Sequence, residues 1–240
     1  MVCEYELVLQ VKVFFLVIGV MEEQRVVFCQ DLLLMGQDER FWENIVASDE
    51  TWCFAYDAAT KRQCRLGGAK LSKTKETAIS KIASENDVNC FFFDAEGVID
   101  REFVPEGQKV NAEFCVGVLD RLLKRIRRVR TAKFQSSEWF LFHDNAPSPN
   151  AASVKFLANR NVAVLQNPPY SPDLAPADYF VFPKFKFPLK GRYFQSVEEI
   201  QCAVTKELNN ISKTAFLESM KKLKERANKC IDQGGVYFEE

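Results

Sequence analysis

A single histidine, His143, is present among the 240 residues, and its solitude excludes several kinds of active site. A Ser-His-Asp hydrolase would have to use this one residue, but the G-x-S-x-G string typical of a large group of those enzymes is absent. Zinc sites are built from closely spaced histidines and cysteines, and the eight cysteines include no C-x-x-C pair. Their scattered spacing also gives no disulfide framework, which favours reduced thiols in a cytosolic or nuclear protein.

Phosphate-binding glycine motifs are also missing. The sequence has neither a G-x-G-x-x-G string nor a P-loop, so we expect no nucleotide cofactor. The longest apolar stretch, residues 7–20, is interrupted by Gln10 and Lys12 and is shorter than the ~20 residues that cross a bilayer. It also lacks the basic start of a signal peptide. We therefore expect no membrane segment. We predict a buried strand or helix here, with a degraded leader as the alternative. For the domain organisation we expect an atypical apolar leader at residues 1–21 and one domain at 22–240.

The apolar content of 47%, with 21 phenylalanines, is sufficient for one domain of considerable size. Short apolar runs predict strands in the first half, among them a strand pair at 45–56 with Asp49 at its turn. Helical periodicity predicts a long helix at 111–130, and Ser196 with Glu199 forms a capping box for another. Strands followed by interleaved helices indicate an α/β domain with a mixed sheet.

Three aspartates stand at the ends of apolar elements. Asp49 ends a short apolar run, Asp144 follows the run at 139–142, and Asp178 follows the proline-rich turn at 168–176. Acids in such positions tend to converge on one site. Carboxylate oxygens are the ligands that hard divalent cations prefer. The pattern therefore predicts a divalent-metal site for phosphodiester chemistry.

Two strings carry a family resemblance: HDNAP at 143–147 and PPYSPDLAPADY at 168–179. They closely resemble the catalytic core of mariner-type transposases, a family that includes SETMAR-like methyltransferase–transposase fusions. The resemblance covers about residues 22–240. It implies an RNase H-like fold with a mixed central β-sheet flanked by helices, in which two acids lie on adjacent strands and the third on a helix.

The resemblance further implies a catalytic site. Asp49, Asp144 and Asp178 would be the triad that holds two Mg²⁺ or Mn²⁺ ions. His143 and Asn145 would orient these carboxylates without binding the metal ions themselves. For His143, a histidine at the edge of the core with a backbone partner is an equally open interpretation. The family reaction is the nicking of transposon-end DNA followed by strand transfer. Double-stranded DNA as partner, a homodimer and a nuclear location are implied as well.

The sequence departs from the mariner pattern in three places. Only 33 residues separate Asp144 from Asp178, one fewer than in the pattern. Pro149 replaces a common histidine. The stretch at 64–89, which we interpret as a long loop, lacks the family's tryptophan and its proline- and lysine-rich string, so communication within a dimer is more in doubt than metal binding.

Basic residues cluster in two places that could contact DNA phosphates. The first is one face of the long predicted helix, and the second follows Asp178 and alternates with Phe185, Phe187, Tyr193 and Phe194. For the helix, a solvated face is the alternative; for the aromatics, core packing competes with base stacking. The candidates are Arg121, Lys124, Arg125 and Arg128, and Lys184, Lys186, Lys190 and Arg192.

Mariner enzymes usually begin with paired helix-turn-helix modules that recognise the transposon ends. We see no such segment before Glu22 and therefore expect a transposase core that is truncated or domesticated. The rival hypothesis is a catalytically inactive nuclear DNA-binding or dimerisation remnant on the same fold. Metal-dependent nicking of DNA would distinguish the two.

Overall fold

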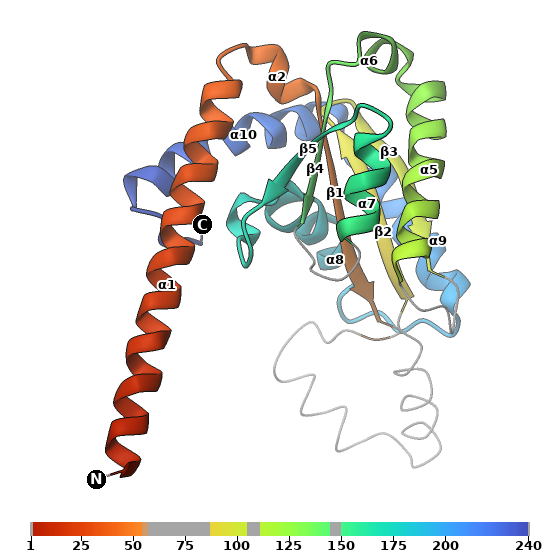
Figure 1. The fold of residues 1–240 in the computed structure, drawn as a ribbon. Coiled ribbons are helices and arrows are strands. Elements are labelled where there is room, and N and C mark those ends of the chain that lie inside the picture. Colours follow the sequence, from red (N-terminus) through yellow and green to blue (C-terminus); the bar gives the residue numbers. More distant parts are fainter. Residues whose placement is uncertain (1, 55, 57–86, 105–110, 145–149, 240) are drawn as a thin grey trace, which may run out of the picture.

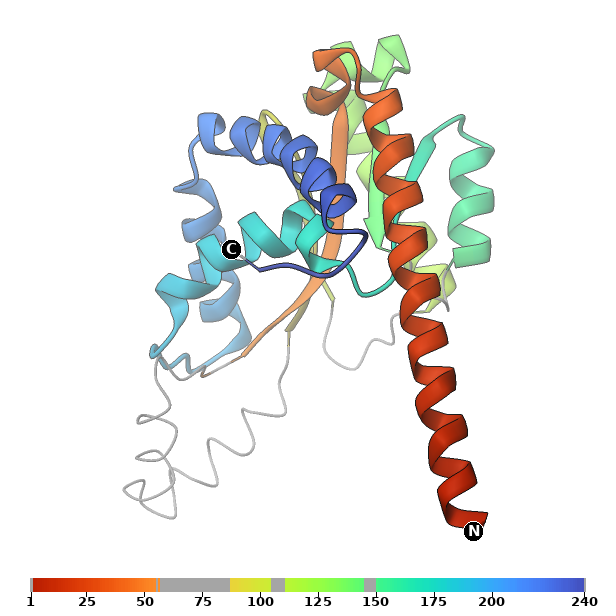
Figure 2. The same cartoon turned by 90° about the vertical axis from the view of Figure 1, so that its left-hand side faces the viewer.

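A computed structural model describes residues 2–54, 56, 87–104, 111–144 and 150–239; for 2–18, 87–89, 144, 150 and 151 it describes the backbone alone. Residues 64–86 of the predicted loop at 64–89 and Asn145 lie outside the described residues, and for 87–89 the loop prediction was wrong because these residues belong to a strand. The chain begins with α1 (Val2–Met35) and α2 (Glu39–Glu43). Helix α1 continues across residues 21 and 22 without a break, and Figures 1 and 2 show its N-terminal part extending beyond the rest of the ribbon.

Five strands form one mixed sheet in the order β3-β2-β1-β4-β5. Strand β1 pairs antiparallel with β2 and parallel with β4, β2 pairs antiparallel with β3, and β4 pairs parallel with β5. This confirms the predicted α/β class. Their bounds are β1 (Ile45–Cys53), β2 (Asp87–Asp94), β3 (Gly97–Phe103), β4 (Phe140–Asp144) and β5 (Ala163–Asn167).

One expectation about β1 was wrong. The predicted strand pair at 45–56 is a single strand, and Asp49 lies inside it rather than at a turn. Side chains of a strand point alternately to the two faces of the sheet. Ala47 and Cys53 accordingly pack on one face and Val46 on the other, which a hairpin at Asp49 would not allow.

Helices cover both faces of the sheet (Figure 1). On one face lie α5 (Ala112–Val129), which ends at the short α6 (Thr131–Ser136), and α7 (Asn150–Ala158). The predicted helix at 111–130 is confirmed: Asn111 accepts a hydrogen bond from the Phe114 amide as its N-cap, and a stripe that includes Leu122 and Ile126 is buried. The other face carries α8 (Phe182–Leu189), α9 (Val197–Asn209), α10 (Lys213–Asp232) and part of α1.

Two short turns precede α8, namely the 3₁₀ turn η1 (Pro172–Leu174) and the π-helical turn η2 (Ala177–Val181). The predicted capping box is also present, since the Ser196 hydroxyl accepts from the Glu199 amide at the start of α9. Within the part of the chain that the structure describes, no helix is long and apolar enough to cross a membrane.

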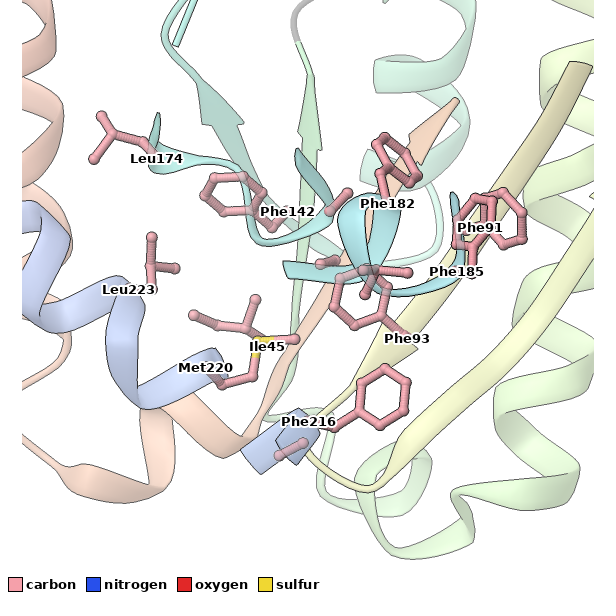
Figure 3. Close-up of a cluster of buried hydrophobic side chains, with 14 of the residues drawn as sticks. Ile45, Phe91, Phe93, Phe142, Leu174, Phe182, Phe185, Phe216, Met220 and Leu223 are labelled. Atoms are coloured by element: carbon pink, nitrogen blue, oxygen red, sulfur yellow. The ribbon is translucent and has the colours of Figure 1, made fainter. Parts of the chain in front are cut away.

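Aromatic side chains dominate the core under α8 and α10. Phe216 of α10 is buried and packs against Phe93 and Phe180, with ring centroids 5.8 and 5.6 Å away (Figure 3 labels Phe93 and Phe216). Phe91 likewise meets Phe185 at 5.2 Å. The sheet, η2, α8 and α10 are therefore held together by one apolar cluster.

Replacing Phe216 by alanine should lower the free energy of unfolding by about 3–5 kcal/mol, because a large buried ring is lost and a cavity remains. Phe187→Ala is the matched control: the Phe187 side chain is 78% exposed, so we expect a change within about 0.5 kcal/mol. Urea denaturation of the three proteins measures both values. Equal losses for the two variants would contradict the packing described.

Candidate active site

Strands β1 and β4 bring Asp49 and Asp144 next to each other. In their parallel pairing Ser48 lies opposite His143, and the two aspartates are the next residue on each strand. Paired strands lie about 4.8 Å apart, so the two backbones are close at this point. Asp144 is in turn the register partner of Asn167 in β5. For Asp144 the structure describes the backbone alone.

Asp178 reaches the cleft at Asp49 from a separate element. It lies in the π-helical turn η2, where its amide donates to the Ala175 carbonyl at 3.0 Å. Irregular turns of this kind are frequent at functional sites. Asp178 and Asp49 line one open cleft of about 590 Å³. The residues around this Asp49–Asp178 cleft include Asp49, Glu50, Asp178, Lys186, Phe187 and Lys190.

Lys186 of α8 and Lys190, the C-cap residue of that helix, place positive charge beside these carboxylates. The Lys186 ammonium donates to the Thr51 hydroxyl and lies 5.2 Å from the centre of the Phe182 ring. Lys190, one turn further along, is exposed at the cleft. The lysines of this cleft suit an anionic substrate. The carboxylates suit cations that would be bound together with that substrate.

His143 has the hydroxyl of Ser48 as its partner, with 3.0 Å between Nδ1 and Oγ. The same hydroxyl lies 3.1 Å from the Phe142 carbonyl, to which it donates. A hydroxyl has one hydrogen, so when it is donated to the carbonyl the contact with Nδ1 requires the tautomer that carries its proton on Nδ1. His143 also borders a small cavity of about 40 Å³ that reaches Asp49. One interpretation of His143 expected a backbone group as its partner, but the partner observed is the Ser48 side chain.

The cysteines at this cavity are poorly suited to act as nucleophiles or metal ligands. Cys90 and Cys115 border it, and burial raises the pKa of both thiols above the ordinary value. A thiol with a raised pKa is a poor nucleophile and a poor metal ligand at neutral pH. The oxygen donors are left as the reactive groups of this region.

The basic residues expected on α5 lie away from the Asp49–Asp178 cleft, since α5 packs on the opposite face of the sheet. Arg121 pairs with Glu102 at 2.6 Å and Lys124 with Asp120 at 2.7 Å, while Arg125 donates to the Ile99 carbonyl at 3.2 Å. Arg128 is exposed. Exposed pairs are weak, so these partners do not prevent contact with phosphates, but any such contact lies apart from the cleft.

The second group of basic residues is divided by the structure. Lys186 and Lys190 line the cleft, Lys184 is exposed, and the Arg192 guanidinium lies 5.3 Å from the Phe194 ring. The interleaved aromatics divide as well: two belong to the core and two face solvent. Buried are Phe185 and Phe194, and exposed are Phe187 at 78% and Tyr193 at 46%.

Sequence reasoning missed two residues at the site. Thr51 holds Lys186, and Asn167 is buried with its amide nitrogen donating to the Ser171 carbonyl at 3.1 Å. Among the side chains that the structure describes, none forms a hydrogen bond with the Asn167 side-chain oxygen. Asn167 borders a small cavity beside Asp49. Only the alternation of β1, which puts Thr51 on the same side as Asp49, could have indicated the first of these.

Comparison with known proteins places this geometry in a family. No family model matches the chain. The Mos1 mariner transposase of Drosophila mauritiana is 30% identical over 219 residues, which is 90% of this chain and 63% of that protein. The human histone-lysine N-methyltransferase SETMAR is 27% identical over 209 residues, 87% of this chain and 30% of that protein. The chain thus spans less than two thirds of the length of either relative.

Solved structures agree with the sequence matches. The crystal structure of the catalytic domain of Mos1 mariner transposase superposes with a TM-score of 0.74 at 28% identity, covering 91% of this chain and 96% of that one. A Mos1 catalytic domain with Raltegravir and Mg gives 0.75 at 28%, covering 91% and 97%. A pre-cleavage Mos1 transpososome gives 0.79 at 27%, covering 92% and 64%. The fold is therefore RNase H-like, and the chain belongs to the family of mariner-type transposase catalytic domains.

Proposed function

We propose that this chain nicks DNA and transfers strands at transposon ends, using divalent metal ions held by Asp49, Asp144 and Asp178. The observation that carries the proposal is the Asp49–Asp178 cleft, where two carboxylates from separate elements meet two lysines. Asp144 is on the neighbouring strand β4, one residue beyond the pair formed by Ser48 and His143, as Asp49 is on β1. The relatives that match the chain are a transposase and a methyltransferase of the SETMAR type.

The donor atoms fit hard cations. All candidate ligands are oxygens. The buried Asn167 oxygen beside Asp49 has no partner among the described side chains and would offer one more acceptor for a metal-bound water. Within the described side chains, which exclude that of Asp144, no group of three histidines, cysteines or acids is close enough to hold a metal. The site we propose therefore needs Asp144. Mos1 catalytic domains have been solved with Mg and with Mn, which supports these metals here, with two ions as the finer proposal.

The protein's own groups would bind and orient the substrate. Lys186, steadied by Thr51, and Lys190 would hold a phosphate of the DNA backbone over the cleft. Asp49, Asp144 and Asp178 would hold the divalent cations. Bound divalent ions would stabilise the charge that develops on the attacking and leaving oxygens. Phe187, exposed at the rim, would contact the sugar or a base.

The partners follow from the same proposal. Mos1 has been solved as a pre-cleavage transpososome and in a paired-end complex with a transposon end, which supports double-stranded DNA and a homodimer for this chain. A DNA substrate in turn favours the nucleus. We also propose that residues 22–240 form the catalytic unit. His143 and Asn145 remain proposed supports of the triad.

A nicking assay on supercoiled plasmid tests the activity. We expect conversion of supercoiled to open-circular DNA with Mn²⁺ or Mg²⁺, and none with Ca²⁺ or with EDTA. The protein must be free of contaminating nuclease, which the inactive variants discussed below establish. If no divalent metal supports nicking while DNA is still bound, the inactive DNA-binding or dimerisation remnant is the correct description.

Binding to DNA should depend steeply on salt, because the lysines of the cleft reach phosphates and not base edges. The double change Lys186→Gln with Lys190→Gln should weaken binding to an inverted-repeat duplex and to a scrambled duplex equally. The slope of log K against log salt should fall by about two, close to one for each phosphate contact. Fluorescence anisotropy across a salt series measures this.

Lys213→Gln with Lys221→Gln is the control, since these exposed lysines of α10 do not line the cleft and remove the same charge. An unchanged slope for the cleft variant would refute the assignment. A strong preference for the inverted repeat that persists at high salt would show that the chain reads bases as well.

A further inference from the structure

A buried ion pair lies directly upstream of Asp178. Asp173, in the turn η1, is only 3% exposed and receives both ends of the Arg25 guanidinium. The two hydrogen bonds measure 2.8 Å from Nη1 to Oδ1 and 2.5 Å from Nη2 to Oδ2. Arg25 belongs to α1 and lies 148 residues away in the sequence. This planar, two-point contact fixes both the position and the orientation of the carboxylate.

A second arginine holds the same turn from α10. Arg226 donates to the backbone carbonyl of Asp173 at 2.9 Å, and its guanidinium lies 4.3 Å from the centre of the Tyr179 ring. Tyr179 directly follows Asp178, and its hydroxyl donates to the Ser219 carbonyl at 2.9 Å. The segment that carries Asp178 is therefore held by Arg226 on both sides, at Asp173 and at Tyr179.

The C-terminal tail completes the enclosure. Arg25 Nε donates to the Gly235 carbonyl at 2.7 Å, and the Phe238 amide approaches Asp173 Oδ2 at 3.4 Å. Gly235 has a φ of +87°, and a Cβ there would lie 2.1 Å from the Glu22 carbonyl oxygen of α1. Only glycine allows the tail to pass this close to α1. Helix α1 and the C-terminal tail, which are remote in sequence, thus meet at the Asp173 carboxylate.

The stretch between Asp173 and Asp178 leaves little freedom. The Leu174 amide donates to the Ser171 carbonyl at 3.0 Å, and the amides of Asp178 and Tyr179 both donate to Ala175. A shift of Asp173 would therefore be carried through two hydrogen-bonded turns to Asp178, which lines the cleft. Catalytic geometry is sensitive to displacements of about 1 Å.

Stability alone does not account for this cluster. A buried ion pair must recover the cost of removing two charges from water, and apolar replacements of similar volume are often no less stable. What a bidentate pair supplies in addition is a defined geometry. We propose that Arg25, Asp173 and Arg226 are positioning residues that set the Asp178 carboxylate for metal binding in the Asp49–Asp178 cleft. The proposal rests on the metal-dependent function proposed above.

Asp173→Asn tests it, because the amide keeps the size of the side chain and loses its charge. We expect the Mn²⁺ concentration for half-maximal binding to rise about 10-fold or more, which is typical when a group that orients a metal ligand is lost. Isothermal titration calorimetry measures this directly, without turnover. Half-maximal nicking should shift to higher Mn²⁺ by the same factor, while affinity for duplex DNA should stay unchanged.

Asp94→Asn is the matched control. Asp94 is fully buried and pairs with Arg130 at 2.9 Å and Lys133 at 2.5 Å, at the end of β2 and away from the cleft. It therefore reproduces the loss of a buried, paired carboxylate without touching the turn before Asp178. We expect a lower melting temperature and unchanged Mn²⁺ affinity. Arg226→Lys, which keeps the charge but loses the planar fork, should shift Mn²⁺ affinity in the direction of Asp173→Asn and serves if that variant does not fold.

The outcomes separate the two proposals. If the parent binds Mn²⁺ but neither Asp173→Asn nor Arg226→Lys changes that affinity more than Asp94→Asn does, the positioning role is refuted and the proposed function stands. If the parent neither binds Mn²⁺ nor nicks DNA, the proposed function fails and the positioning role fails with it.

Discussion

Asp49→Asn and Asp178→Asn will each lower the rate of metal-dependent plasmid nicking by at least about 100-fold while the protein remains folded. An amide has the shape of a carboxylate but not its negative charge, so each change removes an anionic ligand and little else. A loss of this size is on the order of what one charge-stabilising group contributes to an enzyme. Agarose-gel time courses at saturating Mn²⁺ measure the rates.

Asp232→Asn is the control for this result. Asp232 is exposed at the end of α10 and does not border the Asp49–Asp178 cleft, so the same chemical change there should leave the nicking rate unaltered. Nicking by the Asp49 and Asp178 variants at the rate of the parent would mean that the activity belongs to a contaminant or that these residues do not hold the metal.

Mn²⁺ will raise the melting temperature of the parent, and Asp144→Asn will abolish most of that rise. A ligand that binds only the folded state stabilises it by RT ln(1 + [L]/Kd), which is about 2.7 kcal/mol at 100 times Kd. For a chain of this length that corresponds to a shift on the order of 5–10 °C. Thermal melts of both proteins, with and without Mn²⁺, give the comparison.

The stability of the metal-free proteins provides a second test. Carboxylates gathered without a cation repel one another, so removing one charge relieves the folded state. Asp144→Asn without metal should therefore be no less stable than the parent. A clear loss of stability would instead indicate that Asp144 is held by structural hydrogen bonds. If millimolar Mn²⁺ does not shift the parent at all, the enzyme interpretation gives way to a DNA-binding remnant.

Local patterns in the sequence were sufficient for the helices. The stripe of α5 and the capping box at Ser196 both depend on neighbours within one or two turns. Such spacings are set by the 3.6-residue repeat and by unpaired amides at helix ends, which operate at short range in the chain. For residues 7–20 of α1 the sequence left a strand or a helix open, because the apolar residues there follow no clear helical period.

The positions of the three aspartates and the family were also accessible from the sequence, since the strings around Asp144 and Asp178 are specific. The geometry of the site was not. That Asp49 lies within a strand depends on β1 pairing with both β2 and β4, which are remote segments. Nor does any spacing distinguish the buried Phe185 from the exposed Phe187, because the packing partners of α8 decide that difference.

The least predictable contacts join residues that are far apart in the chain. Thr51 meets Lys186 across 135 residues and Arg25 meets Asp173 across 148. The sequence by itself determined which residue types are present, the local helices, the family and the candidate acids. Only the tertiary structure decided which charges face one another, because a hydrogen bond or ion pair between distant segments exists only after the sheet and its covering helices have packed.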